Sequence, residues 1–213
     1  MDCCYLAISS QEVCPEPIPD RIRRLLDLGV PYIQLRDKTE SIRVRHRWTV
    51  QLAPAYRDRL LINGRPDLAL LTGSAGVHLP ARSYSISDAR TLVDDTALIG
   101  RSTHRREEAM MAEDMGADYI TFGPVYPTPS KPDWEKADLP GLDGLKEVCK
   151  TVSIPVLALG GIDRPNRIRA SLEAGASGVA GIRMLFASDS PKRDWKQART
   201  AIDSVRKRKE HSG

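Results

Sequence analysis

The sequence lacks several features that would assign it to a particular class of protein. No stretch reaches about 18 consecutive apolar residues, so we expect no membrane-spanning helix and no membrane partner. Its first residues, Met1-Asp2-Cys3-Cys4, are not a basic segment followed by a long apolar core, so no secretory signal is expected. The four cysteines, at positions 3, 4, 14 and 149, show no zinc-ligand spacing and indicate reduced thiols in the cytoplasm.

A strong excess of one charge is also missing. The 213 residues include 32 basic and 28 acidic side chains, which gives a formal net charge of +4 at pH 7. This excess suits an anionic ligand, but it is too weak to predict a nucleic-acid partner. With 41% hydrophobic and 28% charged residues, the composition is typical of a folded globular protein and not of a disordered chain.

Eight short apolar runs alternate with helix-like segments along the chain. The runs predict strands at Tyr5–Ile8, Tyr32–Leu35, Leu60–Ile62, Gly76–Leu79, Ala97–Ile99, Tyr119–Phe122, Pro155–Leu159 and Gly178–Ile182. The segments between them predict helices at Ile18–Leu28, Ser41–Arg57, Ser87–Val93, Arg106–Met115, Leu142–Val152, Asn166–Ala174 and Asp194–Arg208, with a turn or two at Pro66–Leu71. Eight parallel βαβ units predict an α/β fold, a single (β/α)8 TIM barrel over residues 1–213. The basic residues 206–213 are expected to form a frayed C-terminal tail.

The polar residues after the second run form the clearest candidate binding motif. In a (β/α)8 barrel the active site lies at the carboxyl ends of the strands, where the loops converge on one mouth. Side chains alternate along a strand, so Gln34, Arg36 and Lys38 are expected to point together into that mouth. Three donors, two of them cationic, suit phosphate or pyrophosphate oxygens. Salt bridges to Asp37 or Glu40 are the alternative use of these cations.

Glycine-rich turns after the last two runs predict a phosphate site. Gly160-Gly161 follows the seventh run, and Gly181-Ile182 ends the eighth. Bare backbone there lets amide N–H groups approach a ligand, which is how (β/α)8 barrels commonly bind phosphate. Tight turns without a ligand are the alternative interpretation.

Further candidates follow the third and fifth runs. Asn63 follows the third run, and Ser102 and His104 follow the fifth. Because an imidazole ordinarily titrates near neutral pH, His104 is a candidate acid/base group. Helix capping by the neighbouring hydroxyls is the alternative there, and His78 is expected to be a satisfied barrel residue.

The segment after the sixth run is unusually long for a barrel loop. About 18 residues precede the next helix, and they include Thr128, Ser130 and Lys131. A loop of that length in a compact domain is usually a lid or a binding loop, in which Lys131 would neutralise a carboxylate or phosphate. A proline-rigid exposed loop is the alternative.

Carboxylates are missing from the loops that would hold a divalent cation. The third run is followed by Asn63-Gly64-Arg65 and the fourth by Pro80-Ala81-Arg82-Ser83, with no acid in either. Asp67 is expected to cap the turn that follows. Because magnesium is commonly bound through one or two carboxylates, we predict no metal site.

The motifs also occur in a characteristic order. Gln-Leu-Arg-x-Lys is followed by Gly-Val-His-Leu, Gly-x-Ser-x-His, Asp-Tyr-Ile-x-Phe-Gly-Pro-Val-Tyr-Pro-Thr and Ala-Leu-Gly-Gly-Ile. This order resembles the thiamine phosphate synthase/TenI superfamily over residues 4–186. The resemblance implies a (β/α)8 barrel, in agreement with the pattern of runs.

One activity of the superfamily joins a pyrimidine pyrophosphate to a thiazole phosphate, giving thiamine phosphate and pyrophosphate. The resemblance implies that the thiazole phosphate binds at the backbone of Gly161, Ile182 and Arg183. It implies that the pyrophosphate and the reacting partners bind at Gln34, Arg36, Lys38, Asn63, Ser102, Thr128, Ser130 and Lys131. The synthase pattern has magnesium-binding acids where this chain has Gly64 and Ser83, so Mg²⁺ is expected only if the chain is a synthase.

The other activity is that of the TenI-type thiazole tautomerase, which aromatises a thiazole carboxylate phosphate by moving a proton and needs no metal. The missing acids favour it, with His104 as the acid/base. We therefore predict a cofactor-free isomerase of thiamine biosynthesis that acts on a phosphorylated thiazole. A thiamine phosphate synthase and a non-catalytic thiazole or thiamine phosphate-binding protein are the alternatives. Pairing into a homodimer is left open, and Met110 and Met111 are expected to be core rather than interface residues.

Overall fold

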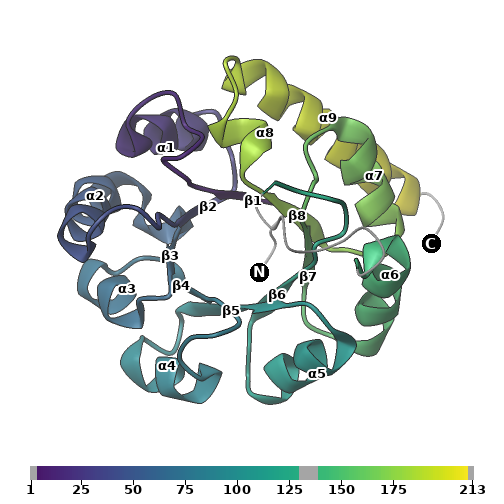
Figure 1. Cartoon of the computed structure of the whole chain (residues 1–213), viewed down its shortest axis with the longest axis horizontal. Helices are drawn as coiled ribbons and strands as arrows, with labels where there is room; N and C mark the ends of the chain where they lie inside the picture. Colours follow the sequence, from purple (N-terminus) through teal and green to yellow (C-terminus); the bar gives the residue numbers. More distant parts are fainter. Residues whose placement is uncertain (1–3, 130–138, 211–213) are drawn as a thin grey trace.

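The predicted (β/α)8 TIM barrel is confirmed. The structure, a computed structural model, describes residues 4–129 and 139–210. Its strands are β1 (Tyr5–Ile8), β2 (Tyr32–Leu35), β3 (Leu60–Asn63), β4 (Gly76–Leu79), β5 (Leu98–Thr103), β6 (Tyr119–Phe122), β7 (Val156–Leu159) and β8 (Gly178–Gly181). They pair in parallel in chain order, and β8 closes the barrel against β1, as the ring of strands in Figure 1 shows.

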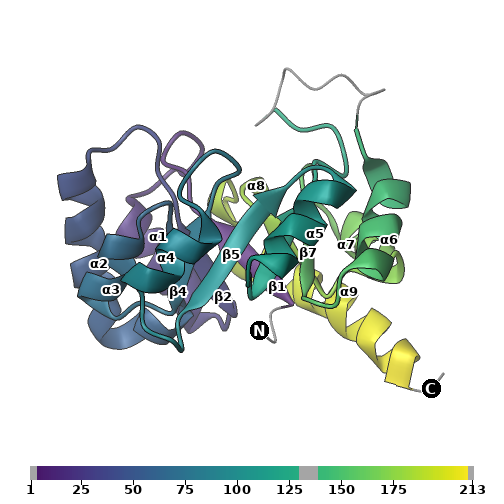
Figure 2. The ribbon, with the colours of Figure 1, turned by 90° about the horizontal axis from the view of Figure 1, so that it is seen from below.

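Helices surround the barrel on the outside (Figures 1 and 2). They are α1 (Ile18–Asp27), α2 (Ile42–Tyr56), the 3-10 turn η1 (Arg57–Arg59), α3 (Pro66–Thr72), α4 (Ile86–Leu92), α5 (Arg106–Asp114), α6 (Gly141–Thr151), α7 (Pro165–Glu173), α8 (Arg183–Phe186) and α9 (Pro191–Glu210). Among the helices of the described ranges, none is both long and apolar enough to cross a lipid bilayer.

Alternating side chains give each strand two buried faces. On β1, Leu6 and Ile8 belong to the cluster that fills the barrel, whereas Tyr5 and Ala7 belong to the larger core beneath the helices. Burial on both faces is why the strands appear in the sequence as nearly continuous apolar runs. Polar side chains at the strand ends, such as Asn63 of β3, lie where the loops leave the barrel.

Helix boundaries follow the local sequence. Pro66 stands at the start of α3, where its missing N–H costs nothing. After α1, Gly29 has a φ of +89°, and the amide of Val30 donates to the carbonyl oxygen of Leu25 at 3.1 Å. This left-handed glycine ends the helix and turns the chain toward β2.

Three elements differ from the sequence prediction. Strand β5 was expected at Ala97–Ile99 but continues to Thr103, so Ser102 lies within the strand. The short helix α8 has only four residues and no apolar period that a sequence pattern could reveal. Residues 206–210 of the expected tail belong to α9, which reaches Glu210.

The outer surface of α5 also differs from expectation. Met110 and Met111 are 39% and 56% exposed, although the sequence analysis assigns them to the core. Ala109 and Ala112 are the buried residues of this helix. The apolar stripe of α5 is therefore narrow and made of small side chains.

A buried arginine fastens the first helix to the last part of the barrel. Arg21 is 2% exposed and pairs with Glu16. Its guanidinium donates to the carbonyl oxygens of Leu185 at 2.6 Å and Ser188 at 2.9 Å. These contacts join α1 to the end of α8 and the segment that follows it.

Replacing this arginine should destabilise the protein far more than replacing its neighbour. Arg21→Ala leaves the carbonyl groups of Leu185 and Ser188 without this buried donor, and Glu16 keeps only its pair with Arg24, so we expect the free energy of unfolding to fall by about 3 kcal/mol. Arg23→Ala on the same helix removes only an exposed pair with Asp20 and should change it by less than about 1 kcal/mol. Urea denaturation measures both, and equal losses would contradict the structural role of Arg21.

Candidate active site

A cavity of about 380 Å³ opens at the carboxyl ends of the strands. Its lining includes the predicted site residues Gln34, Arg36, Lys38, Asn63, Ser102, His104, Thr128, Gly160, Gly161, Gly181, Ile182 and Arg183. The structure therefore brings together every predicted site residue that it describes. Two further predicted residues, Ser130 and Lys131, lie outside the described ranges.

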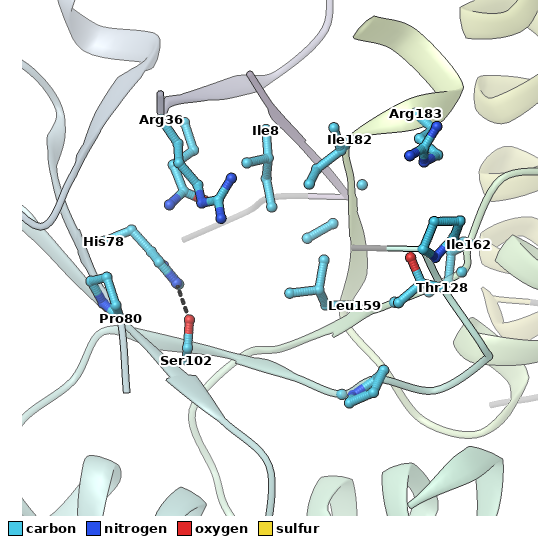
Figure 3. Close-up of a pocket in the computed structure, with 18 of the residues that line it drawn as sticks. Ile8, Arg36, His78, Pro80, Ser102, Thr128, Leu159, Ile162, Ile182 and Arg183 are labelled. Atoms are coloured by element: carbon cyan, nitrogen blue, oxygen red, sulfur yellow. Dashed lines mark hydrogen bonds between the residues drawn. The ribbon is translucent and has the colours of Figure 1, made fainter. Parts of the chain in front are cut away.

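The cavity has two polar ends with an apolar strip between them. In Figure 3, Arg36 and Ser102 lie on one side and Arg183 on the other, while Ile8 and Leu159 lie between. We call the first side, with Gln34, Arg36, Lys38 and Ser102, the Arg36 end. We call the second side, with Gly160, Gly161, Ile182 and Arg183, the Arg183 end.

Strand β2 and the residues after it supply most donors of the Arg36 end. Gln34 is 2% exposed, and its Nε2 donates to Oδ1 of Asn63 at 2.7 Å. Arg36 is half-buried, and this burial lowers the pKa of its guanidinium, although the charges of Glu12 and Asp37 act to raise it. Lys38 is exposed at the rim. The alternation predicted from the sequence thus places these side chains on one wall of the cavity.

Asp37 does not neutralise these cations by direct pairing. Its carboxylate accepts hydrogen bonds from the backbone amides of Gln11, Thr39 and Glu40 and from the Thr39 hydroxyl. Burial acts to raise the pKa of Asp37, but these hydrogen bonds together lower it. Within the described residues no ion pair joins Asp37 to Arg36 or Lys38, so both cations can serve a ligand.

Bare backbone forms the Arg183 end. Gly160 and Gly161 have φ values of +100° and +64°, which side chains rarely tolerate. A Cβ on Gly161 would lie 2.6 Å from the carbonyl oxygen of Pro127, so the turn requires glycine there. This turn brings main chain to the cavity beside Ile182 and Arg183, as a phosphate site needs.

Sequence reasoning missed the residue that fixes this turn. Arg167 of α7 donates to the carbonyl oxygen of Gly161, pairs with Asp163 at 3.1 Å and lies over the ring of Tyr126 at 4.7 Å. It therefore connects the β7–α7 turn to the β6–α6 loop. Arg167 lies within a helix and not directly after a strand, so no sequence pattern indicated this role.

His78 is a satisfied barrel residue, as the sequence predicts, and it also reaches the cavity wall. Its Nδ1 lies 3.0 Å from the Tyr119 hydroxyl and its Nε2 lies 2.9 Å from Oγ of Ser102. Burial, together with the positive charges of Arg101 and Arg36, lowers its pKa to about 3. The imidazole is therefore neutral at physiological pH.

His104 is held at the mouth by the loop that follows β6. Its Nδ1 contacts the carbonyl oxygen of Gly123, and its backbone N–H donates to the Glu108 carboxylate at 2.7 Å. Because a carbonyl oxygen only accepts hydrogen bonds, Nδ1 carries the proton. The ring thus lines the cavity in a fixed orientation.

The described residues do not fit a magnesium site. Gly64 and Ser83 offer no carboxylate, and the nearby carboxylate of Asp67 is paired with Arg65. Across residues 4–129 and 139–210, no group of three or more His, Cys, Asp and Glu side chains could hold a metal ion. The described residues of the cavity thus offer cations and backbone amides to an anionic ligand, and no such cluster of metal ligands.

Comparisons with known proteins agree with this geometry. The chain matches the family described as thiamine monophosphate synthase over residues 4–185. A protein of Geobacter sulfurreducens is 44% identical over 167 residues, 77% of each chain. The thiamine-phosphate synthase of Salinibacter ruber is 38% identical over 180 residues, 83% of this chain and 78% of that protein. Thiamine phosphate pyrophosphorylase from Pyrococcus furiosus superposes with a TM-score of 0.84 at 28% identity, covering 96% of this chain and 97% of that one.

These similarities correct the predicted reaction. The prediction of an isomerase, the TenI-type thiazole tautomerase, is wrong, because the relatives are named thiamine-phosphate synthase, which is a transferase. That prediction relied on the missing carboxylates at Gly64 and Ser83. Their absence affects only how the negative charge of a pyrophosphate would be neutralised. The donors Gln34, Arg36 and Lys38, which suit a pyrophosphate, are all present at the cavity. The chain belongs to the thiamine monophosphate synthase family.

Proposed function

We propose that this chain is a thiamine-phosphate synthase, which joins hydroxymethylpyrimidine pyrophosphate to a thiazole phosphate and releases pyrophosphate. The observation that carries the proposal is the cavity with two polar ends and an apolar strip between them. Two flat rings, each bearing one anionic group, fit this arrangement when the rings meet over the strip. The names of the relatives support the same reaction.

The Arg36 end suits the leaving group. When the bond between the pyrimidine methylene carbon and the pyrophosphate oxygen breaks, negative charge increases on the pyrophosphate. Arg36 and Lys38 place two positive charges at this end, and Gln34 and Ser102 add polar groups. Because Arg36 is half-buried, its charge is screened less than that of a surface arginine. Groups held in place before the reaction stabilise the developing charge without reorganising.

The Arg183 end suits the thiazole phosphate. Main-chain amides beside Gly161, Ile182 and Arg183 can donate to phosphate oxygens, and the Arg183 guanidinium adds a charge at the rim. Arg167 fixes the turn by its hydrogen bond to the Gly161 carbonyl oxygen. The phosphate would thereby orient the thiazole ring over the apolar strip.

The nucleophile needs no base from the protein. The thiazole nitrogen attacks with its own lone pair, so the C–N bond forms as the C–O bond breaks and no proton leaves the nitrogen. The acid/base role predicted for His104 is therefore not required in this reaction. Its contact with the carbonyl oxygen of Gly123 instead supports the start of the loop that carries Thr128.

The apolar strip protects the electrophilic carbon. Ile8 and Leu159 lie between the two polar ends, where the methylene carbon of the pyrimidine would pass from oxygen to nitrogen. Excluding water from this place suppresses hydrolysis of the pyrimidine pyrophosphate and strengthens the nearby electrostatic interactions.

Magnesium would supply further charge neutralisation on a pyrophosphate. Gly64 and Ser83 offer no carboxylate to hold it, and the described residues contain no group of three or more His, Cys, Asp and Glu side chains that could bind a metal ion. We propose that Arg36 and Lys38 take a larger share of this charge than they would beside a protein-bound metal ion.

The proposed reaction can be assayed directly. The purified chain, given hydroxymethylpyrimidine pyrophosphate and thiazole phosphate, should form thiamine phosphate and pyrophosphate in equal amounts, as measured by chromatography. Absence of both products, with and without added magnesium, would refute the proposal. Tight binding of thiamine phosphate without turnover would instead identify a non-catalytic binding protein.

Removing one cation from the Arg36 end should impair the reaction specifically. Arg36→Met eliminates a charged hydrogen-bond donor, so we expect kcat/KM to fall about 10- to 100-fold and the affinity for inorganic pyrophosphate to fall similarly. Arg47→Met removes the same charge from an exposed position on α2, outside the cavity lining, and should leave both values unchanged. Equal effects of the two substitutions would show that only net charge matters.

Removing metal ions with a chelator tests whether Arg36 and Lys38 neutralise the pyrophosphate without magnesium. With excess EDTA and no added metal, the chain should retain most of its synthase activity, because Arg36 and Lys38 meet the pyrophosphate directly. The matched reaction contains saturating magnesium in place of EDTA. A strict requirement for magnesium would overturn the proposed role of the cations and leave the synthase assignment intact.

A further inference from the structure

A buried hydrogen-bonded chain leads from the inside of the barrel to the cavity wall. The Tyr119 hydroxyl lies 3.0 Å from Nδ1 of His78, and Nε2 of His78 lies 2.9 Å from Oγ of Ser102. Figure 3 shows the contact between His78 and Ser102 beside Arg36. Tyr119 is fully buried and His78 is 2% exposed, whereas Ser102 is partly exposed and lines the cavity. The proposed reaction gives no role to the two buried members.

Gly100 of the neighbouring strand β5 leaves space for the Tyr119 side chain of this hydrogen-bonded series. A Cβ on Gly100 would lie 2.1 Å from Cζ of Tyr119 and 2.4 Å from its hydroxyl oxygen. Tyr119 otherwise packs with Leu6, Leu61 and Leu157, which fill the barrel with apolar atoms. Polar groups in such surroundings are costly unless each is hydrogen-bonded, so the pattern of donors and acceptors is narrowly determined.

The imidazole has one proton to share between its two contacts. Burial and the positive charges of Arg101 and Arg36 keep His78 neutral. A neutral imidazole has one donor nitrogen and one acceptor nitrogen. Either Tyr119 donates to Nδ1 and Nε2–H donates to Ser102, or Nδ1–H donates to Tyr119 and Ser102 donates to Nε2. These two arrangements give Ser102 opposite properties toward a ligand.

Chemistry favours the first arrangement. The oxygen lone pairs of a phenol are delocalised into its ring, so the Tyr119 hydroxyl is a better donor than acceptor. Its proton then lies on the bond to Nδ1, and Nε2–H donates to Oγ of Ser102. The Thr121 hydroxyl also donates to this oxygen, at 3.5 Å. With its acceptor sites used in this way, Ser102 has its own proton to offer to the cavity.

We propose that Tyr119 and His78 are positioning residues that make Ser102 a hydrogen-bond donor to an anionic oxygen of the bound substrate. The inference rests on the proposed function, in which that oxygen belongs to the pyrophosphate at the Arg36 end. Arg36 supplies charge there, and Ser102 supplies a directed hydrogen bond. In the opposite arrangement His78 would act as a base toward Ser102, and the hydroxyl would repel an anion rather than bind it.

Nuclear magnetic resonance tests the arrangement without any assay of activity. In ¹⁵N-labelled wild-type protein, long-range ¹H–¹⁵N correlations distinguish the protonated ring nitrogen from the unprotonated one. His78, assigned through its own side-chain correlations, should carry its proton on Nε2 and keep the same pattern between about pH 5.5 and 8. A proton on Nδ1, or a ring that titrates in this range, would overturn the proposal even in an active synthase.

A double-mutant cycle tests whether Tyr119 acts through Ser102. Tyr119→Phe should weaken binding of inorganic pyrophosphate about five- to tenfold, as expected for one lost hydrogen bond. In a Ser102→Ala background the same change should alter pyrophosphate binding by less than about twofold. The Ser102 hydroxyl, through which Tyr119 is proposed to act, is absent there. An equal effect in both backgrounds would mean that Tyr119 has only a structural role.

Two further comparisons complete this experiment. Tyr56→Phe removes a tyrosine hydroxyl that donates to Asp27 on the outer surface, and pyrophosphate binding should not change. His78→Gln, whose amide N–H can replace Nε2–H, should bind pyrophosphate more tightly than His78→Leu. If the wild-type chain does not bind pyrophosphate at all, the proposed acceptor is wrong, while the resonance measurement still decides the direction of the hydrogen bonds.

Discussion

A closed barrel of parallel strands requires every strand to end at the same rim. Residues from distant parts of the chain, such as Gln34, Ser102 and Gly161, therefore meet at one cavity without any local motif that joins them. The interior below the rim is filled by apolar side chains, including Leu6 and Leu157. Polar side chains at the rim therefore cost little free energy of desolvation. The strands that carry the donors determine where the two polar ends of the cavity lie.

Sequence patterns predict most of this arrangement, because strand alternation is a short-range property. The spacing of Gln34, Arg36 and Lys38 places all three on the cavity wall, as expected. Contacts between residues far apart in the sequence cannot be predicted in this way. Arg21 donates to a carbonyl group 164 positions away, and His78 is hydrogen-bonded to a hydroxyl 41 positions away. Helix α8 also escaped, since four residues are too few to show a period.

The predicted reaction failed for a different reason. Missing carboxylates at Gly64 and Ser83 exclude only one way of neutralising a pyrophosphate, and they say little about whether one binds. The donors that remain, a half-buried arginine, a rim lysine and a serine held by a neutral histidine, can meet the same charge. The set of donors that a site brings together is therefore a better guide to its reaction than the absence of single carboxylates.

The seam between β1 and β8 also has a consequence for the order of assembly. Across it, Arg21 donates to Leu185 and the Trp195 indole donates to the carbonyl oxygen of Leu28 at 3.0 Å. A ribosome adds about 5–20 residues per second, so α1 emerges many seconds before these partners exist. Until then β1 has an unpaired edge. A nascent chain stopped before β8 would hold the donors of the Arg36 end but not Ile182 and Arg183, so simultaneous binding of the two proposed substrates has to await synthesis of the final strand.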